Sequence, residues 1–208
     1  ARDGAGGADV LPKGREARMI RSLLLLLTVP ALVPALALAQ SSRAERTNYA
    51  ETSSHADVLV FLDSLESRAP GKMARGIIGT SSMGKALPYV IVSRPLVRSA
   101  AEARRTGRPI VYVQGNIHGG EVEGKEALQA LLRDLVLDPK RNVLDSIVLV
   151  AVPIYNADGN DAWGPQEQQR GAQDGPARVG QRPNAMQLDL NRDYIKNEAP
   201  ETMAALAM

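Results

Sequence analysis

The chain has 208 residues, of which 44% are hydrophobic and 23% charged, so it can bury a substantial core and lacks the composition of a disordered protein. It contains no cysteine and two histidines, His55 and His118, which excludes disulfides and cysteine-based metal sites or nucleophiles. The formal net charge of +2 comes from residues 1–39, because the rest of the sequence carries 20 basic and 20 acidic residues. This balance, together with an aromatic content of 3%, argues against a nucleic-acid partner.

Residues 19–39 have the three parts of a secretory signal peptide. A positive flank precedes a leucine-rich apolar core, and positions 37–39 form a small-x-small cleavage site. Two prolines interrupt the core, which is short for a bilayer span, so we expect a cleaved leader rather than a transmembrane anchor or a buried helix. Residues 1–18 would then precede the native product. The mature protein, without a stable membrane span, is expected to be secreted or periplasmic in a bacterium.

The expected mature chain opens with a polar stretch, 40–55, which we interpret as a linker before a catalytic domain at 56–208. Apolar residues at helical spacing predict an amphipathic helix over 57–67, ended by a Pro-Gly pair. Two β-prone runs, 76–80 and 87–92, flank a glycine-containing turn and predict a hairpin. A polar, alanine-rich connection follows.

A strand–helix–strand unit comes next. The short apolar runs 110–113 and 146–153 are typical of strands buried on both faces, and 122–135 has leucine and alanine at helical spacing. This order predicts an α/β fold with a mixed, largely parallel central sheet flanked by helices. In such sheets ligands bind beyond the carboxyl ends of the strands, where His118 and Asn156 lie in the sequence. The glycine- and proline-rich stretch that then runs to position 187 is predicted to be a functional loop.

His118 and Glu121 stand three positions apart on a glycine-containing turn after the 110–113 strand. Zinc accepts imidazole nitrogen and carboxylate oxygen, and a catalytic zinc takes three protein ligands plus water, so this pair can supply two ligands. The alternative is structural, with an ordinary loop histidine and a Glu121 that favours a helix N-terminus. His55 precedes the first predicted helix and is a poor substitute ligand.

A segment near the chain end adds further polar residues, which alone could form a turn with a salt bridge. Taken together, three motifs in order resemble the zinc carboxypeptidase family (the carboxypeptidase A/B-type metallopeptidases), from about Tyr49 to the chain end. The three motifs are His118-x-x-Glu121, Asn156-x-Asp158-Gly159, and the 181–194 segment with Arg182, Asp189, Asn191 and Arg192.

For the metal, the resemblance implies that His118 and Glu121 are two ligands of one Zn2+ ion. Asp189 would accept a hydrogen bond from the other ring nitrogen of His118. The family's third ligand, a histidine, and its general-base glutamate would lie beyond Met208. We therefore expect the amino-terminal part of the fold, incomplete at the C-terminus and inactive alone.

For the substrate, the resemblance implies that Arg182 is catalytic, because it would bind the scissile carbonyl and stabilise the oxyanion. Asn191 and Arg192 would hold the terminal carboxylate, which suits the fork of a guanidinium. The implied activity is that of a metallocarboxypeptidase-like hydrolase cleaving C-terminal peptide or amide bonds by metal-activated water. Its partner would be a peptide or peptide-like substrate with a free C-terminal carboxylate. Two alternatives stay open: an amidoacyl or cell-wall peptide hydrolase on the same scaffold, and a non-catalytic binding relative.

Overall fold

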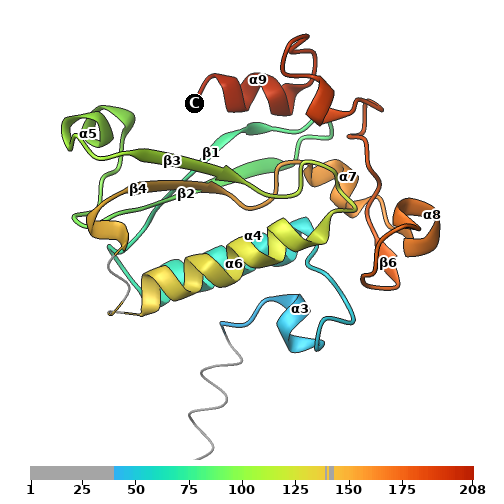
Figure 1. Ribbon diagram of the computed structural model, residues 1–208, viewed down its shortest axis with the longest axis horizontal. Coiled ribbons are helices and arrows are strands. Elements are labelled where there is room, and N and C mark those ends of the chain that lie inside the picture. Colours follow the sequence, from blue (N-terminus) through green and yellow to red (C-terminus); the bar gives the residue numbers. More distant parts are fainter. Residues whose placement is uncertain (1–39, 139, 141–142) are drawn as a thin grey trace, which may run out of the picture. The chain divides into compact units, whose positions relative to one another are not determined.

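A computed structural model describes residues 40–138, 140 and 143–208. The expected upstream segment and signal peptide therefore lie outside the described residues. Figure 1 shows a sheet with helices on both faces. The helices are α3 (Arg43–Arg46), α4 (His55–Arg68), α5 (Ala100–Arg105), α6 (Val122–Leu137), α7 (Ala157–Asp161), α8 (Gln166–Arg170) and α9 (Pro200–Leu206), with short 3-10 turns η1 (Val143–Asp145) and η2 (Leu190–Arg192). The strands are β1 (Ala74–Thr80), β2 (Ala86–Val92), β3 (Ile110–Gln114), β4 (Val148–Val152), β5 (Gly164–Pro165) and β6 (Arg178–Val179).

The main sheet has the order β1-β2-β4-β3. β1 pairs antiparallel with β2 because a tight turn joins them, and β2 also pairs antiparallel with β4. β3 and β4 are parallel, with Tyr112 opposite Val150, because α6 carries the chain back between them. The predicted hairpin, the βαβ unit and the mixed α/β class are confirmed. Among the described strands of this sheet, β3–β4 is the parallel pair and the other two pairs are antiparallel, so the sheet is mixed as expected but not largely parallel.

The main core lies between the sheet and the helices α4 and α6, which cover the same face (Figure 1). Leu62 and Leu65 on α4 and Leu132 on α6 are fully buried there. Burying a side chain of this size stabilises the fold by about 1.5–3 kcal/mol. On the other face α9 packs against β1. Within the described part of the chain, no helix is both long and apolar enough to cross a membrane.

Three stretches expected to lack regular structure contain short helices of four to six residues. Ser42 caps α3, Ser99 caps α5 and Asn156 caps α7, each by accepting a hydrogen bond from a backbone N–H three residues on. Ser and Asn favour N-caps, but helices this short cannot show the apolar periodicity that identifies longer ones. The 156–187 stretch, expected to be one loop, also contains α8 and the β5–β6 pair.

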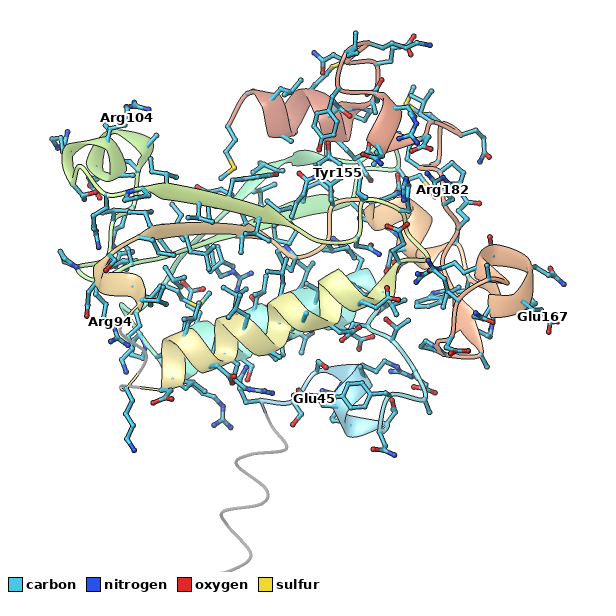
Figure 2. All side chains as sticks on the ribbon, viewed as in Figure 1. Glu45, Arg94, Arg104, Tyr155, Glu167 and Arg182 are labelled. Atoms are coloured by element: carbon cyan, nitrogen blue, oxygen red, sulfur yellow. The ribbon has the colours of Figure 1, made fainter. Side chains whose placement is uncertain are left out.

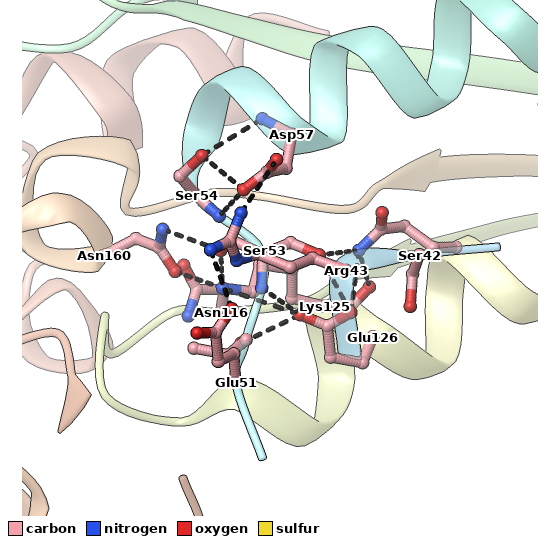
Figure 3. Close-up of polar contacts among 12 residues, drawn as sticks. Ser42, Arg43, Glu51, Ser53, Ser54, Asp57, Asn116, Lys125, Glu126 and Asn160 are labelled. Carbon is pink, nitrogen blue, oxygen red and sulfur yellow. Dashed lines mark hydrogen bonds and ion pairs between the residues drawn. The ribbon is translucent and has the colours of Figure 1, made fainter. Parts of the chain in front are cut away.

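A buried polar network fixes the start of α6 (Figure 3). The ammonium group of Lys125 is fully buried and donates to the carbonyl of Ser53 and to Asn160 Oδ1. The neighbouring Glu126 carboxylate accepts from the Ser53 N–H at 2.6 Å and from the Thr52 hydroxyl at 2.8 Å. The network therefore joins the segment before α4 to both α6 and α7.

The buried lysine predicts a pH dependence of stability. Burial lowers the pKa of Lys125 to about 8, although nearby carboxylates, Glu126 first, oppose the shift. In the unfolded chain the ammonium titrates near 10.4. Between about pH 8 and 10.4 the unfolded chain thus binds more protons, and stability rises with pH through this window.

Lys125→Met removes the titrating group at similar length. We expect the free energy of unfolding of the native protein, minus that of Lys125→Met, to increase by about 1–3 kcal/mol from pH 7.5 to 10.5. Urea unfolding at several pH values measures this difference. A difference that stays constant would mean that Lys125 titrates normally in the folded state.

Candidate active site

The turn after β3 is built from residues with special backbone requirements. Asn116 has a left-handed φ of 62°, which asparagine tolerates better than most residues, and its Nδ2 donates to the carbonyls of His118, Gly119 and Glu121. Gly119 packs against α7 so closely that a Cβ atom would lie 2.1 Å from the carbonyl carbon of Gly159. The turn thus places the side chains of His118 and Glu121 next to each other.

Both nitrogens of the His118 ring have carboxylate partners. Nδ1 lies 2.7 Å from Glu121 Oε1, and Nε2 lies 2.9 Å from Asp189 Oδ1. The imidazole is 6% exposed, whereas the Glu121 side chain is 38% exposed. With a proton on Nε2 bound to Asp189, the imidazole would offer its Nδ1 lone pair to a metal ion held on the side of Glu121.

Asp189 also joins His118 to Arg182. The Nε and Nη2 atoms of Arg182 donate to Asp189 Oδ2 at 3.1 and 3.0 Å, and the Asn191 N–H donates to Oδ1 at 3.0 Å. Burial alone would raise the pKa of Asp189, but the hydrogen bonds from His118, Arg182 and the Asn191 backbone outweigh it and lower this pKa to about 2. Asp189 is therefore an anion near neutral pH, well suited to accept a proton donor on each side.

A hollow of about 250 Å³ opens beside these groups. His118, Gly120, Glu121 and Arg182 line it, together with residues 169–173 at and just after the end of α8. Arg170 in this lining is itself fixed, since its Nη1 donates to the Gly120 carbonyl at 2.6 Å. Arg182 is 51% exposed and lies close to α7, at the carboxyl ends of β3 and β4 (Figure 2). A substrate can therefore reach the guanidinium and the two ligand-type side chains from the same hollow.

The donor set fits a partial zinc site. An imidazole nitrogen and a carboxylate oxygen face each other, and the second ring nitrogen is oriented by an aspartate, an arrangement common for metal-bound histidine. Within residues 40–138, 140 and 143–208, no group of three His, Cys, Asp or Glu side chains is placed to hold a metal ion. His118 and Glu121 are thus two candidate ligands.

The remaining candidates lie at the edge of this arrangement or away from it. Asn191 reaches Asp189 through its backbone, and both Asn191 and Arg192 are exposed and absent from the lining of the hollow. The Arg192 guanidinium donates to the Asn191 carbonyl at 3.2 Å. Their role in carboxylate binding stays a prediction. His55 is buried at the start of α4, with Nε2 2.7 Å from the Ala86 carbonyl.

Sequence reasoning gave no role to Asn116, Arg170 or Asn184. An asparagine directly before a glycine-rich turn is a usable signal for Asn116, because it tolerates a left-handed backbone. Arg170 lies 52 positions beyond His118 in the sequence, and no motif indicates that α8 folds back onto the turn. Asn184 lies within the 181–194 segment, but its burial is a property of the tertiary structure.

Comparisons with known proteins identify relatives of this chain. The sequence profile of the family described as zinc carboxypeptidase matches residues 58–204. The chain is similar to Carboxypeptidase 2 of Trichophyton tonsurans (29% identity over 124 residues, covering 59% of this chain and 20% of that protein). It is also similar to Probable carboxypeptidase 2 of Arthroderma benhamiae (28% identity, with the same coverage). The chain thus spans about a fifth of the length of these curated relatives.

Two solved structures have a similar fold. A metallo-carboxypeptidase from Burkholderia cenocepacia matches with a TM-score of 0.53 and 19% identity, covering 75% of this chain and 37% of the other. Bovine thrombin-activatable fibrinolysis inhibitor, in complex with a tick carboxypeptidase inhibitor, matches with a TM-score of 0.53 and 14% identity, covering 77% and 56%. At these identities the similarity shows the fold alone.

Proposed function

Because the chain belongs to the zinc carboxypeptidase family, we propose that its site takes part in hydrolysis of C-terminal peptide or amide bonds. The observation that carries the proposal is the placement of His118 between Glu121 and Asp189, with Arg182 bound to the same aspartate. These four side chains come from segments about 70 positions apart in the sequence, yet they form one connected set.

His118 Nδ1 and the Glu121 carboxylate would hold one Zn2+ ion in this proposal. When bound, zinc supplies a Lewis acid that polarises a carbonyl and lowers the pKa of water. Asp189, 2.9 Å from Nε2, would keep a proton on that nitrogen and so leave the Nδ1 lone pair for the metal. A third histidine ligand and a general-base glutamate would be contributed by sequence beyond Met208.

Arg182 is the proposed contact to the scissile carbonyl. Its Nε and Nη2 atoms are used on Asp189, and Nη1 lies 4.0 Å from Glu121 Oε1, beside the hollow. A guanidinium there can donate to a carbonyl oxygen as negative charge develops on it. Asn191 and Arg192 would bind the free terminal carboxylate, and the exposed position of both leaves them accessible to it.

The proposed location is outside the cytoplasm, in the periplasm or the extracellular medium. The support is the leader pattern at 19–39, with its apolar core and small-x-small cleavage site. Sequencing the N-terminus of the mature protein identifies the cleavage point, which should fall after Ala39.

An assay with matched peptides tests the proposed function. The zinc-loaded 208-residue chain and a longer product of the same reading frame are each given one peptide with a free C-terminus and the same peptide amidated. We expect the longer product to release the last residue from the free peptide at least about 100-fold faster than from the amidated one. The amide would leave polar groups of a carboxylate-binding site without partners.

Two further substrates distinguish the alternatives. Hydrolysis of acyl-amino acids alone would favour the amidoacyl hydrolase, and hydrolysis of muropeptides alone would favour the cell-wall peptide hydrolase. Equal rates on free and amidated peptides would contradict the carboxylate-binding role of Asn191 and Arg192. Absence of turnover in the longer, zinc-loaded product would contradict the proposed function.

A further inference from the structure

The turn that joins Arg182 to Asp189 is closed around one asparagine. Asn184 is fully buried, and its backbone N–H donates to the Leu188 carbonyl at 3.0 Å. Its side-chain Oδ1 accepts from the N–H groups of Met186 and Leu188, both at 3.0 Å. The amide oxygen thus substitutes for backbone partners and fixes the path of the chain between two site residues.

The turn includes a residue in an unfavourable backbone conformation. Gln187 has a φ of 60°, in the left-handed region that residues other than Gly, Asn and Asp rarely adopt. Its N–H donates to the Asn184 carbonyl at 3.0 Å. Such a conformation persists only when surrounding contacts hold it. The bonds of Asn184 are the contacts that do so here.

Glu201 on α9 in turn holds the Asn184 amide. Its Oε2 accepts from Asn184 Nδ2 at 3.1 Å, and both side chains are fully buried. Burial raises the pKa of Glu201, and the nearby Asp158 adds to the shift, while the hydrogen bond from Asn184 opposes it. A buried carboxyl group needs such a donor, which makes the contact specific.

The position of Glu201 is set by the sheet rather than by the site. A Cβ atom on Gly79 of β1 would lie 2.6 Å from Ala204 Cβ, so α9 packs on the strand with no room between them. At the other end of the turn, the Arg182 carbonyl accepts from Asn156 Nδ2 at 3.2 Å. Both ends of the turn are thus tied to the rigid part of the fold.

We propose that Asn184 and Glu201 are positioning residues, which act through the 182–189 turn to hold Arg182 and Asp189 against His118. Neither side chain lines the hollow, so neither would touch the substrate. A role of Asn184 and Glu201 in catalysis rests on the proposed function. Their effect on the structure does not, because it can be measured at the contact between His118 and Asp189.

Because the chain has two histidines, the placement of Asp189 against His118 can be measured without zinc and without catalysis. His118 Nε2 lies 2.9 Å from Asp189 Oδ1, whereas His55 Nε2 lies 2.7 Å from the Ala86 carbonyl. In a ¹⁵N-histidine-labelled protein at fixed pH, the hydrogen-bonded Nε2–H signal of His118, distinguished from that of Nδ1 beside Glu121, reports the placement of Asp189. The signal of His55 is the internal reference.

Two variants should break the link. Asn184→Leu removes the amide at similar volume, and Glu201→Met removes the acceptor. In each we expect the His118 ring N–H signal to be lost while the His55 signal remains, and zinc affinity to fall by about 10-fold or more. The double variant Asn184→Asp with Glu201→Gln reverses donor and acceptor, because the new glutamine can donate to the new aspartate. It should retain the His118 signal and bind zinc within about 3-fold of the native protein.

Gln129→Leu is the matched control, because Gln129 is an equally buried amide on α6 that bonds Ser53 and Glu126 instead. It should lower the melting temperature yet keep the His118 signal. An unchanged His118 signal in folded Asn184→Leu and Glu201→Met would overturn the inference, as would a folded double variant that fails to retain it. A His118 signal that responds as expected, together with no turnover by the longer, zinc-loaded product, would leave the positioning role intact and refute the proposed function.

Discussion

Arg182→Ala is expected to lower kcat for release of a C-terminal residue by about 10²–10³, the usual cost of removing one preorganised donor to a developing oxyanion. The guanidinium lies beside the hollow that His118 and Glu121 line, and its remaining Nη1 is placed near Glu121. The effect should fall mainly on kcat, since the contact strengthens as charge develops on the carbonyl oxygen. Steady-state kinetics of the zinc-loaded longer product measures it.

Arg104→Ala is the matched control for the loss of a cation. Arg104 is exposed on α5, at the opposite end of the sheet from Arg182 (Figure 2), so its removal changes the net charge without touching the site. Arg182→Lys should recover only part of the rate that Arg182→Ala loses. A guanidinium can bind Asp189 and the substrate carbonyl at the same time, and a single ammonium group lacks this forked geometry. A kcat within about 3-fold of the native value in Arg182→Ala would remove Arg182 from the reaction.

Gly119→Ala is expected to destabilise the fold by about 3 kcal/mol, at the upper end of the cost of overpacking. The added methyl carbon would lie 2.1 Å from the carbonyl carbon of Gly159 and 2.3 Å from the Asn160 nitrogen. Both are backbone atoms within α7, which is capped by Asn156 and tied to Lys125, so they cannot yield by a simple rotation. Urea unfolding followed by circular dichroism gives the free energy.

Gly175→Ala tests whether the loss is specific. A Cβ at Gly175 would have no heavy atom within 4 Å among its surroundings, so this change should stay within about 0.5 kcal/mol of the native stability. We also expect Gly119→Ala, where it still folds, to bind zinc more weakly, because the displaced turn separates His118 from Glu121. Equal stability of the two alanine variants would show that the turn and α7 can move apart.

The sequence predicted most of the main sheet and its two long helices, because these carry apolar periodicity. The α4 helix was expected over 57–67 and spans His55–Arg68, and the strand pair around the 81–85 turn is present as β1 and β2. The short capped helices were not predicted. Four to six residues give too few positions for a pattern, and their stability comes from caps and tertiary contacts.

The candidate site could be anticipated in kind but not in detail. The spacing of His118 and Glu121 indicated two metal-type ligands, and the resemblance led us to expect Asp189 and Arg182 beside them. Nothing in the local sequence indicated that Asn184 is buried or that α9 supports it, since both depend on how the chain end packs on β1. Such long-range contacts are visible only in the folded structure.

In the proposed site, His118 and Glu121 bind one zinc ion beside Asp189 and Arg182. Diffraction from zinc-soaked crystals on both sides of the zinc absorption edge tests it most directly. We expect an anomalous peak within about 2.0–2.2 Å of both His118 Nδ1 and a Glu121 carboxylate oxygen, with Nε2 donating to Asp189. A peak on Nε2, or a peak bound to His55 and absent from the His118–Glu121 pair, would contradict it.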